Sequence, residues 1–153
     1  MDKVTLQRIS KLHPIVRGEV TQIINECNAR LTGRAQIRIS QGLRTNEEQN
    51  ALYAKRPKVT NAKGGQSIHN YGFAVDIVLI VDGVKASWDT KSDWDEDKKS
   101  DFMECVEVFK VHGWNWGGDW KRFKDMPHFD KSGFSDWKKL ANLPVDPDGY
   151  VII

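Results

Sequence analysis

One carboxylate inside an apolar run constrains this chain of 153 residues more than any other feature. The segment Ser67 to Ile80 reads SIHNYGFAVDIVLI, with Asp76 between Val75 and Ile77. Side chains alternate across a strand, so Asp76 points away from the face that carries these two neighbours. An ionised carboxylate in an apolar strand costs several kcal/mol unless it is paired or bound to a metal. We therefore expect a partner for Asp76.

Two histidines are suitable partners. Gly72 would let the chain turn just before the strand and bring His69 back over Asp76. A His and an Asp held together in this way form two-thirds of the ligand set of a catalytic zinc site. His128 is the best third ligand, because a preceding proline favours extended backbone and Asp125 stands three residues before it.

The other two histidines are better explained by local structure. His13 precedes a proline at a helix start, and His112 lies in the last turn of a helix, where an imidazole favours the negative end of the dipole. A metal-free alternative also exists for the first pair, since His69 and Asp76 could form a plain buried hydrogen bond.

Hydrophobic periodicity predicts an α+β fold. The segment 35–40 alternates apolar and polar residues like a half-buried strand, and the Asp-Gly pair between the apolar runs 73–80 and 84–88 predicts a hairpin. Thr45 and Glu48 have the spacing of a capping box at a helix start. A further helix covers 102–112, and a core-facing helix follows Pro14 with apolar positions at helical spacing: Ile15, Val16, Val20, Ile23, Ile24, Cys27 and Leu31. Because helices and strands do not alternate as βαβ units, we expect one α+β domain over 1–153.

Composition excludes several classes of protein. A net charge of +2, with both signs evenly mixed, gives no nucleic-acid footprint, and no apolar run is long enough to span a membrane. The N-terminal residues lack the apolar core of a signal peptide, so we expect synthesis as a cytosolic protein. Cys27 and Cys105 fit buried, reduced thiols. We expect the charged segment 89–101 to be an exposed connection and 143–153 to pack irregularly on the domain.

Two motifs resemble a known family. SIHNYGFAVD has the form Ser-x-His-x-x-Gly-x-Ala-x-Asp, and DMPHF has the form acid-x-Pro-His-Phe. Together they resemble the zinc peptidases of the VanY and VanX carboxypeptidase group, which includes phage L-alanyl-D-glutamate endolysins. QGLRT and WNWGGDW agree in content and in order, and the resemblance covers roughly Ser40 to Phe129.

This resemblance implies the chemistry of the site. His69, Asp76 and His128 would bind one zinc ion, and Asp125 would be the catalytic acid/base. Arg44 would face the scissile carbonyl. The implied fold is a small antiparallel sheet with flanking helices, of the hedgehog-like carboxypeptidase type, with the motifs in a core of about 40–129 and no separate wall-binding domain.

Substrate contacts are less constrained. Ser67 would lie near the substrate backbone, and we expect Tyr71 and Trp116 to contact substrate as well. Each has a structural alternative: Ser67 could be only a turn residue, and Trp114, Trp116 and Trp120 suit a core as well as a cleft wall. Arg44 could simply pair with Glu47 or Glu48. Asp125 could be a solvated loop acid, with Asp119 and Asp130 as rivals for its role.

The predicted function is that of a zinc-dependent peptidoglycan endopeptidase. Carboxypeptidases of the group use glutamate as the acid, whereas position 125 is aspartate, as in the endolysin branch. The expected bond is L-Ala-D-Glu in the peptide stem, and the expected setting is a monomeric phage enzyme in the host cytoplasm until lysis, without membrane insertion. The alternatives are a D,D-carboxypeptidase or dipeptidase, and a non-catalytic module that binds wall peptide with structural zinc.

Overall fold

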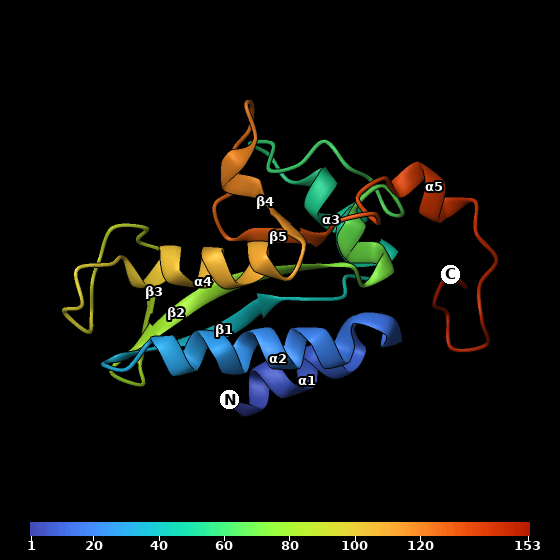
Figure 1. The fold of residues 1–153 in the computed structure, drawn as a ribbon. Helices are drawn as coiled ribbons and strands as arrows, with labels where there is room; N and C mark the ends of the chain where they lie inside the picture. The colour runs from blue at the N-terminus through green and yellow to red at the C-terminus, as the bar shows by residue number, and fades with distance from the viewer.

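The computed structural model describes residues 1–153 and is built around one antiparallel sheet. The strands lie in the order β1-β2-β5-β4, and β3 pairs with the second half of β2. Their bounds are Ala35–Gln41 (β1), Ala74–Val81 (β2), Lys85–Ser87 (β3), Trp114–Trp116 (β4) and His128–Lys131 (β5). Figure 1 shows the helices around this sheet. The predicted α+β class is confirmed.

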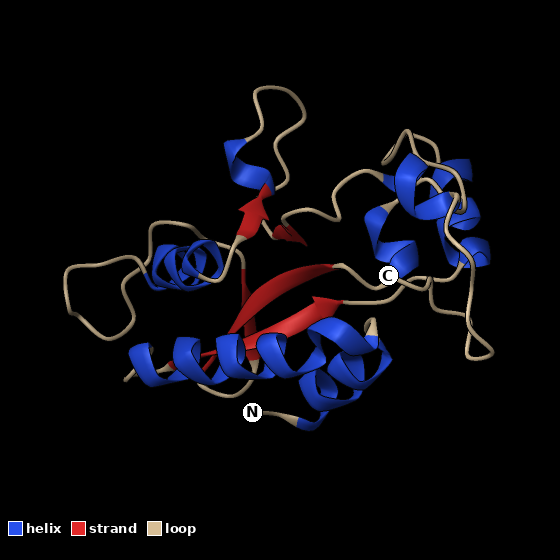
Figure 2. Cartoon of the chain, turned by 45° about the vertical axis from the view of Figure 1, so that its right-hand side comes forward, coloured by secondary structure: helices blue, strands red, loops and turns tan.

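Five α-helices and two short 3-10 helices complete the fold. Figures 1 and 2 show the long helix α2 running along the sheet, with α1 beside it and α4 nearby. The bounds are Lys3–Lys11 (α1), Pro14–Arg30 (α2), Asn46–Ala54 (α3), Asp101–Val111 (α4), Trp137–Ala141 (α5), Ile68–Tyr71 (η1) and Gly117–Asp119 (η2). None of the helices has the length and apolar character that a membrane span requires.

The core is formed on one face of β2. Val75, Ile77 and Leu79 are fully buried and join the apolar residues of α2 and α4 in one cluster. The alternation of a strand then directs Asp76 to the opposite face. The sheet thus separates the apolar core from a polar face that is available for chemistry.

Helix α2 forms where the sequence predicts it. Pro14 is its first residue, and the His13 ring nitrogen Nδ1 accepts a hydrogen bond from the Ile15 N–H at 3.3 Å. The buried positions recur at helical spacing: Val16, Val20, Ile23, Ile24 and Cys27. The prediction is wrong for Ile15, which is 56% exposed. One residue before the buried Val16, it lies about 100° away around the helix and faces solvent.

The predicted turns are confirmed. Asp82 and Gly83 have φ of 54° and 77° and join β2 to β3 as a hairpin. Thr45 precedes α3, and its hydroxyl accepts a hydrogen bond from the Glu48 N–H at 3.0 Å. That contact is one half of the predicted capping box.

The two histidines that the sequence analysis set aside as structural do have structural contacts, and these reach residues far away in the sequence. His13 is buried, stacks on Phe73 and contacts the Val151 carbonyl through Nε2 at 2.7 Å. That contact ties the C-terminal segment to the domain. His112 follows the last residue of α4 and pairs with Glu26 at 3.0 Å.

The two cysteines are free and buried, as predicted. Cys27 lies on α2 and Cys105 on α4. A hydrogen bond between the two thiols, together with burial, raises the pKa of Cys105 well above its usual range. The Cys105 thiol therefore stays protonated, and both side chains pack as small apolar groups where the two helices meet.

The charged segment before α4 differs from the prediction. The stretch 96–99 is exposed, but Trp94 is half-buried against the core, and Asp101 and Glu104 at the start of α4 are buried. Thr32 donates a hydrogen bond to Asp95 at 3.3 Å, so the loop is docked on the turn between α2 and β1. The charge of this segment led to the prediction of exposure. The docking could not be predicted from charge, because it depends on a tertiary contact.

Candidate metal centre and active site

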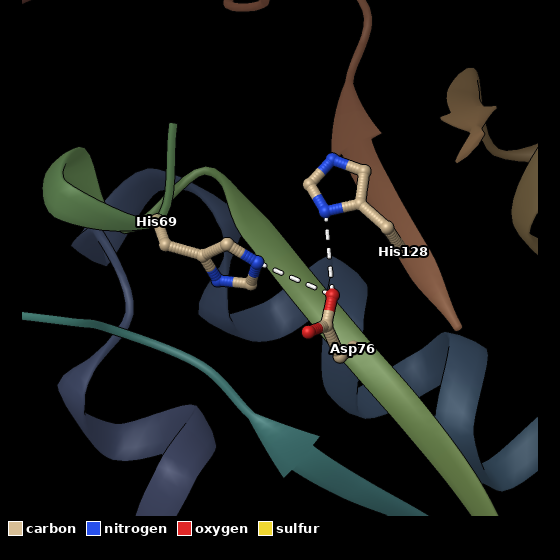
Figure 3. A group of neighbouring side chains, drawn as sticks. All are labelled: His69, Asp76 and His128. Atoms are coloured by element: carbon tan, nitrogen blue, oxygen red, sulfur yellow. Dashed lines mark hydrogen bonds and ion pairs between the residues drawn. The ribbon is translucent and has the colours of Figure 1, made fainter. Parts of the chain in front are cut away.

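Three side chains from separate elements converge on the polar face of the sheet (Figure 3). His69 Nε2 lies 3.2 Å from Asp76 Oδ1, and His128 Nδ1 lies 3.3 Å from the same oxygen. One candidate ligand atom from each residue lies within 4.8 Å of the others. These are the three residues that the sequence predicts as metal ligands.

Local sequence explains how His69 reaches this position. Ser67 caps the 3-10 helix η1, and its hydroxyl accepts from the His69 N–H at 3.3 Å. Gly72 ends η1 in the left-handed conformation with φ of 78°. A Cβ at this position would also approach His13 N to 2.4 Å, so only glycine fits. The predicted bend before β2 is confirmed.

Strand pairing sets the positions of the other two. Asp76 on β2 lies directly opposite His128 on β5 in the antiparallel register. Residues directly opposite in such a pair place their side chains on the same face of the sheet, within reach of one another. The register of two strands far apart in sequence therefore completes the cluster.

Hydrogen bonds on the outer side fix the orientation of both imidazoles. His69 Nδ1 lies 2.8 Å from the Gly42 carbonyl oxygen, and His128 Nε2 lies 2.8 Å from Asp130 Oδ2. Because both oxygens only accept, these two nitrogens donate. In the neutral rings the inner nitrogens then direct lone pairs at Asp76 Oδ1. Three acceptors that face one another need a cation between them, either a proton or a metal.

The pKa values of Asp76 and His128 agree with this requirement for a cation. Burial favours the neutral form of Asp76, but hydrogen bonds from His128 and His69 outweigh it and hold its pKa below the usual range. Burial lowers the pKa of His128, yet Asp130 and Asp76 raise it to about 9. With no metal bound, a proton therefore occupies the cluster at neutral pH. Two imidazole nitrogens and one carboxylate also fit the ligand set of a catalytic zinc site.

Asp130 supports His128 from behind. Ser135 donates to its Oδ1 at 2.6 Å and Asn115 donates to the same oxygen at 3.1 Å. The prediction considered Asp130 only as a rival for the role of Asp125, and the structure places it against the outer nitrogen of His128. Strand alternation could have predicted this contact, since His128 and Asp130 are two residues apart and therefore lie on the same face of the strand.

Asp125 lies half-buried in the turn before β5. Its carbonyl accepts from the His128 N–H at 3.2 Å, and its N–H donates to the Gly117 carbonyl at 3.1 Å. Burial and the charge of Asp76 raise the pKa of its carboxyl, against the opposing charges of His128, His69 and Arg44. Asp125 thus belongs to the electrostatic environment of the three converging residues.

Arg44 lies at the junction of β1 and α3. Its Nη1 donates to Gln49 Oε1 at 2.7 Å, and Gln49 in turn donates to the Ala62 carbonyl at 2.9 Å. The predicted alternative was an ion pair with an adjacent glutamate, and the hydrogen-bond partner is instead the buried Gln49. Burial lowers the pKa of Arg44, and the charges of Asp76, Glu48 and Asp125 partly offset this effect. Gln49 was not foreseen as its partner.

The three expected substrate residues make local contacts. The Ser67 hydroxyl caps η1, and the Tyr71 hydroxyl donates to the Gly65 carbonyl at 2.6 Å. Trp116 is largely buried, and its Nε1 donates to the Met126 carbonyl at 2.7 Å. Their contact with substrate stays a prediction.

A wide hollow of about 850 Å³ adjoins the cluster, and Asp125 lies on its wall. Trp120 lines it, and the ring centre of Trp120 lies 5.1 Å from that of His128. The rest of the wall includes the exposed Phe123, Lys58 and Lys138 and the half-buried Trp137. A peptide laid in this hollow would reach Asp125.

Comparisons with known proteins agree with this geometry. The profile of the D-alanyl-D-alanine carboxypeptidase family matches residues 60–131. The peptidoglycan L-alanyl-D-glutamate endopeptidase CwlK of Bacillus subtilis (strain 168) is 42% identical over 127 residues, which span 79% of this chain and 74% of that protein. The crystal structure of the L-Ala D-Glu endopeptidase ChiX of Serratia marcescens has the same fold, with a TM-score of 0.60, 22% identity, and coverage of 86% of this chain and 89% of that one. This chain belongs to the D-alanyl-D-alanine carboxypeptidase family of peptidases.

Proposed function

We propose that this protein is a zinc-dependent peptidoglycan endopeptidase that hydrolyses the L-Ala-D-Glu bond of the peptide stem. The observation that carries the proposal is the convergence of His69, Asp76 and His128 beside the half-buried carboxyl of Asp125. The identity shared with CwlK supports the choice of bond.

His69 Nε2, Asp76 Oδ1 and His128 Nδ1 would hold the metal, because the other ring nitrogen of each histidine is already hydrogen-bonded to Gly42 or Asp130. Zinc bound there would supply a Lewis acid and lower the pKa of a water molecule to about 7. Asp130 and the Gly42 carbonyl keep both rings in the tautomer that this binding requires.

Asp125 is the proton carrier in this proposal. Its raised pKa suits a general base, because proton transfer is most efficient when the pKa of the catalytic group lies near the working pH. Its carboxylate would accept a proton from the attacking water and return it to the departing amine nitrogen. A single side chain then serves both halves of the hydrolysis.

Arg44 would stabilise the negative charge that develops on the carbonyl oxygen of the scissile bond. Its positive charge already acts on both Asp76 and Asp125, and its Nε is buried without a partner. Gln49 holds the other end of the guanidinium and so fixes its direction.

A D,D-carboxypeptidase is the second candidate, because such an enzyme needs a cation for the free terminal carboxylate. Lys58 and Lys138 line the hollow beside Asp125 and meet that requirement. The same two cations also suit the carboxylates within a peptide stem, so their presence does not choose between the two bonds.

Purified muropeptides test the proposal. Zinc-loaded protein should release fragments with a new D-glutamyl N-terminus, as read by mass spectrometry, and chelated protein should release none. Release of terminal D-alanine would support the carboxypeptidase instead. Binding of muropeptides without any cleavage, in zinc-loaded and chelated protein alike, would support the non-catalytic module.

We also propose that the enzyme acts as a phage endolysin that stays in the cytoplasm of its host, as a monomer, until lysis. Expression in bacteria provides the check: cells should remain intact until the membrane is permeabilised and then lose turbidity. Lysis without permeabilisation would contradict this placement, and light scattering would report the oligomeric state.

A further inference from the structure

We propose that the segment from Asp93 to Glu104, here called the acidic loop, forms a second cation site and binds Ca²⁺. Its carboxylates meet at the start of α4, away from the zinc ligands, and two of their oxygens are buried without a hydrogen-bond partner. The proposal does not rest on the enzymatic function. Figure 1 shows the acidic loop as the yellow segment that projects beside the start of α4.

The carboxylates form two overlapping groups. Asp93, Asp95 and Asp101 bring one ligand atom each within 4.8 Å of one another, and so do Asp95, Asp97 and Glu104. No ion pair in the structure involves any of these five acids. Like charges at this separation repel, so the group needs an added cation.

Two buried oxygens lie within these groups. Asp101 has no exposed surface and Glu104 is 6% exposed, yet Asp101 Oδ2 and Glu104 Oε2 have no partner. A buried acceptor without a partner is strongly unfavourable, and an unpaired charge is more so. Burial and the neighbouring acids raise the pKa of Asp101 to about 6 and that of Glu104 to about 7. A bound cation would satisfy both oxygens at once.

The spacing of the acids identifies the ion. DWDEDKKSDFME places acids at positions 1, 3, 5, 9 and 12 of a twelve-residue loop, the pattern of the EF-hand calcium loop. The sixth position of that loop requires a sharp turn and is usually glycine. Lys98 occupies it here with φ of 71° and so takes the same left-handed conformation. A donor set made only of oxygens also favours Ca²⁺ over zinc.

A bound Ca²⁺ would strengthen the contacts of the acidic loop and α4 with the rest of the domain. The acidic loop rests on the turn before β1, where a Cβ on Gly33 would approach Asp95 Cα to 2.9 Å. Trp94 also lies under the Arg34 guanidinium at 5.2 Å. Helix α4, which begins inside the site, contacts α2 and β4. We therefore expect Ca²⁺ to stabilise the whole domain, since it would fix the loop and the start of α4 together.

Calcium titration of the zinc-loaded protein tests the proposal. In calorimetry, calcium-free protein should bind one Ca²⁺ per chain with a Kd between about 10⁻⁷ and 10⁻³ M, and Mg²⁺ should bind more weakly. Its Tm should rise with calcium concentration. No heat of binding and no Tm shift at millimolar Ca²⁺ would overturn the proposal.

Variants locate the ion. Asp97→Asn, at an exposed position, and Glu104→Gln, at a buried one, should each weaken Ca²⁺ binding by about tenfold or more. Glu107→Gln is the matched control, because Glu107 lies on the exposed side of α4 and pairs only with Arg30. Should Glu104→Gln fail to fold, Asp97→Asn still decides the question. Wild-type affinity in Asp97→Asn would contradict the assignment.

Discussion

Two acidic regions of this molecule solve the problem of buried charge in different ways. In the candidate metal centre of His69, Asp76 and His128, the carboxylate contacts two imidazoles, and the pKa of His128 is raised to about 9. In the acidic loop, Asp101 accepts one hydrogen bond from the Trp94 N–H at 3.2 Å, but no cationic side chain pairs with Asp101 or Glu104. The first region can neutralise itself without a metal, and the second can do so only by protonating a buried acid.

The donor atoms of the two regions suit different ions. Nitrogen donors held by Gly42 and Asp130 are pre-oriented for a transition metal, whereas the acidic loop offers oxygen alone. The candidate metal centre should therefore fold before it binds metal. The acidic loop should gain order from its cation.

Asp76→Asn should have the largest effect. It removes the charge that both imidazoles contact, so zinc should be lost and muropeptide hydrolysis should fall by several orders of magnitude. Elemental analysis and a hydrolysis assay measure the two outcomes. Calcium binding should be unchanged, and coupled loss of both ions would break the distinction between the two regions.

Asp125→Asn should separate binding from chemistry. The variant keeps a side chain of the same size but removes the base, so hydrolysis should fall by about 100-fold to 10,000-fold while zinc stays bound. A kcat within a few-fold of wild type, with zinc content confirmed in the same sample, would reject the role of Asp125.

Asp130→Asn should act on zinc affinity. Because Asp130 would act on the metal only through the outer nitrogen of His128, the expected loss is about tenfold to 100-fold. Competition with a chromogenic chelator gives the affinity. Ser135→Ala, which removes one support of Asp130, is the milder companion and should fall between this variant and wild type. Unchanged affinity in Asp130→Asn would show that the contact does not tune the site.

The pH dependence of stability should show the smallest effect. The raised pKa of His128 stabilises the metal-free protein fully below about 6.5, and this contribution is lost as pH rises through about 9. Asp101 and Glu104 also have raised pKa values, so burying them destabilises the fold as pH rises from about 4 to about 7. The Tm of metal-free protein should thus fall in two windows. Zinc should remove the upper fall and calcium the lower one; a Tm that is flat across both would contradict this account.

Local signals in the sequence were sufficient for much of the site. Gly72 predicted the bend that returns His69 over Asp76, and the Asp-Gly pair predicted the hairpin. Each depends on the conformation of a few adjacent residues. The three predicted metal ligands were selected because a carboxylate in an apolar strand requires partners, and because the motif resemblance implied the same three residues.

The features that the sequence did not predict depend on long-range contacts. The register that sets Asp76 opposite His128 joins strands about 50 residues apart, and no local pattern encodes it. The acidic loop appeared to be solvated because its charge suggests exposure, while the burial of Asp101 depends on the whole segment docking on the domain. Gln49 behind Arg44 has no sequence signal that we can identify.

The position of the metal tests the central claim most directly. An anomalous-difference map from crystals of the zinc-loaded protein, recorded at the zinc edge, should show one strong peak bound by His69 Nε2, Asp76 Oδ1 and His128 Nδ1. The Zn–N distances should be about 2.0–2.1 Å. A peak held by other residues, or no peak in crystals grown with zinc, would contradict the account.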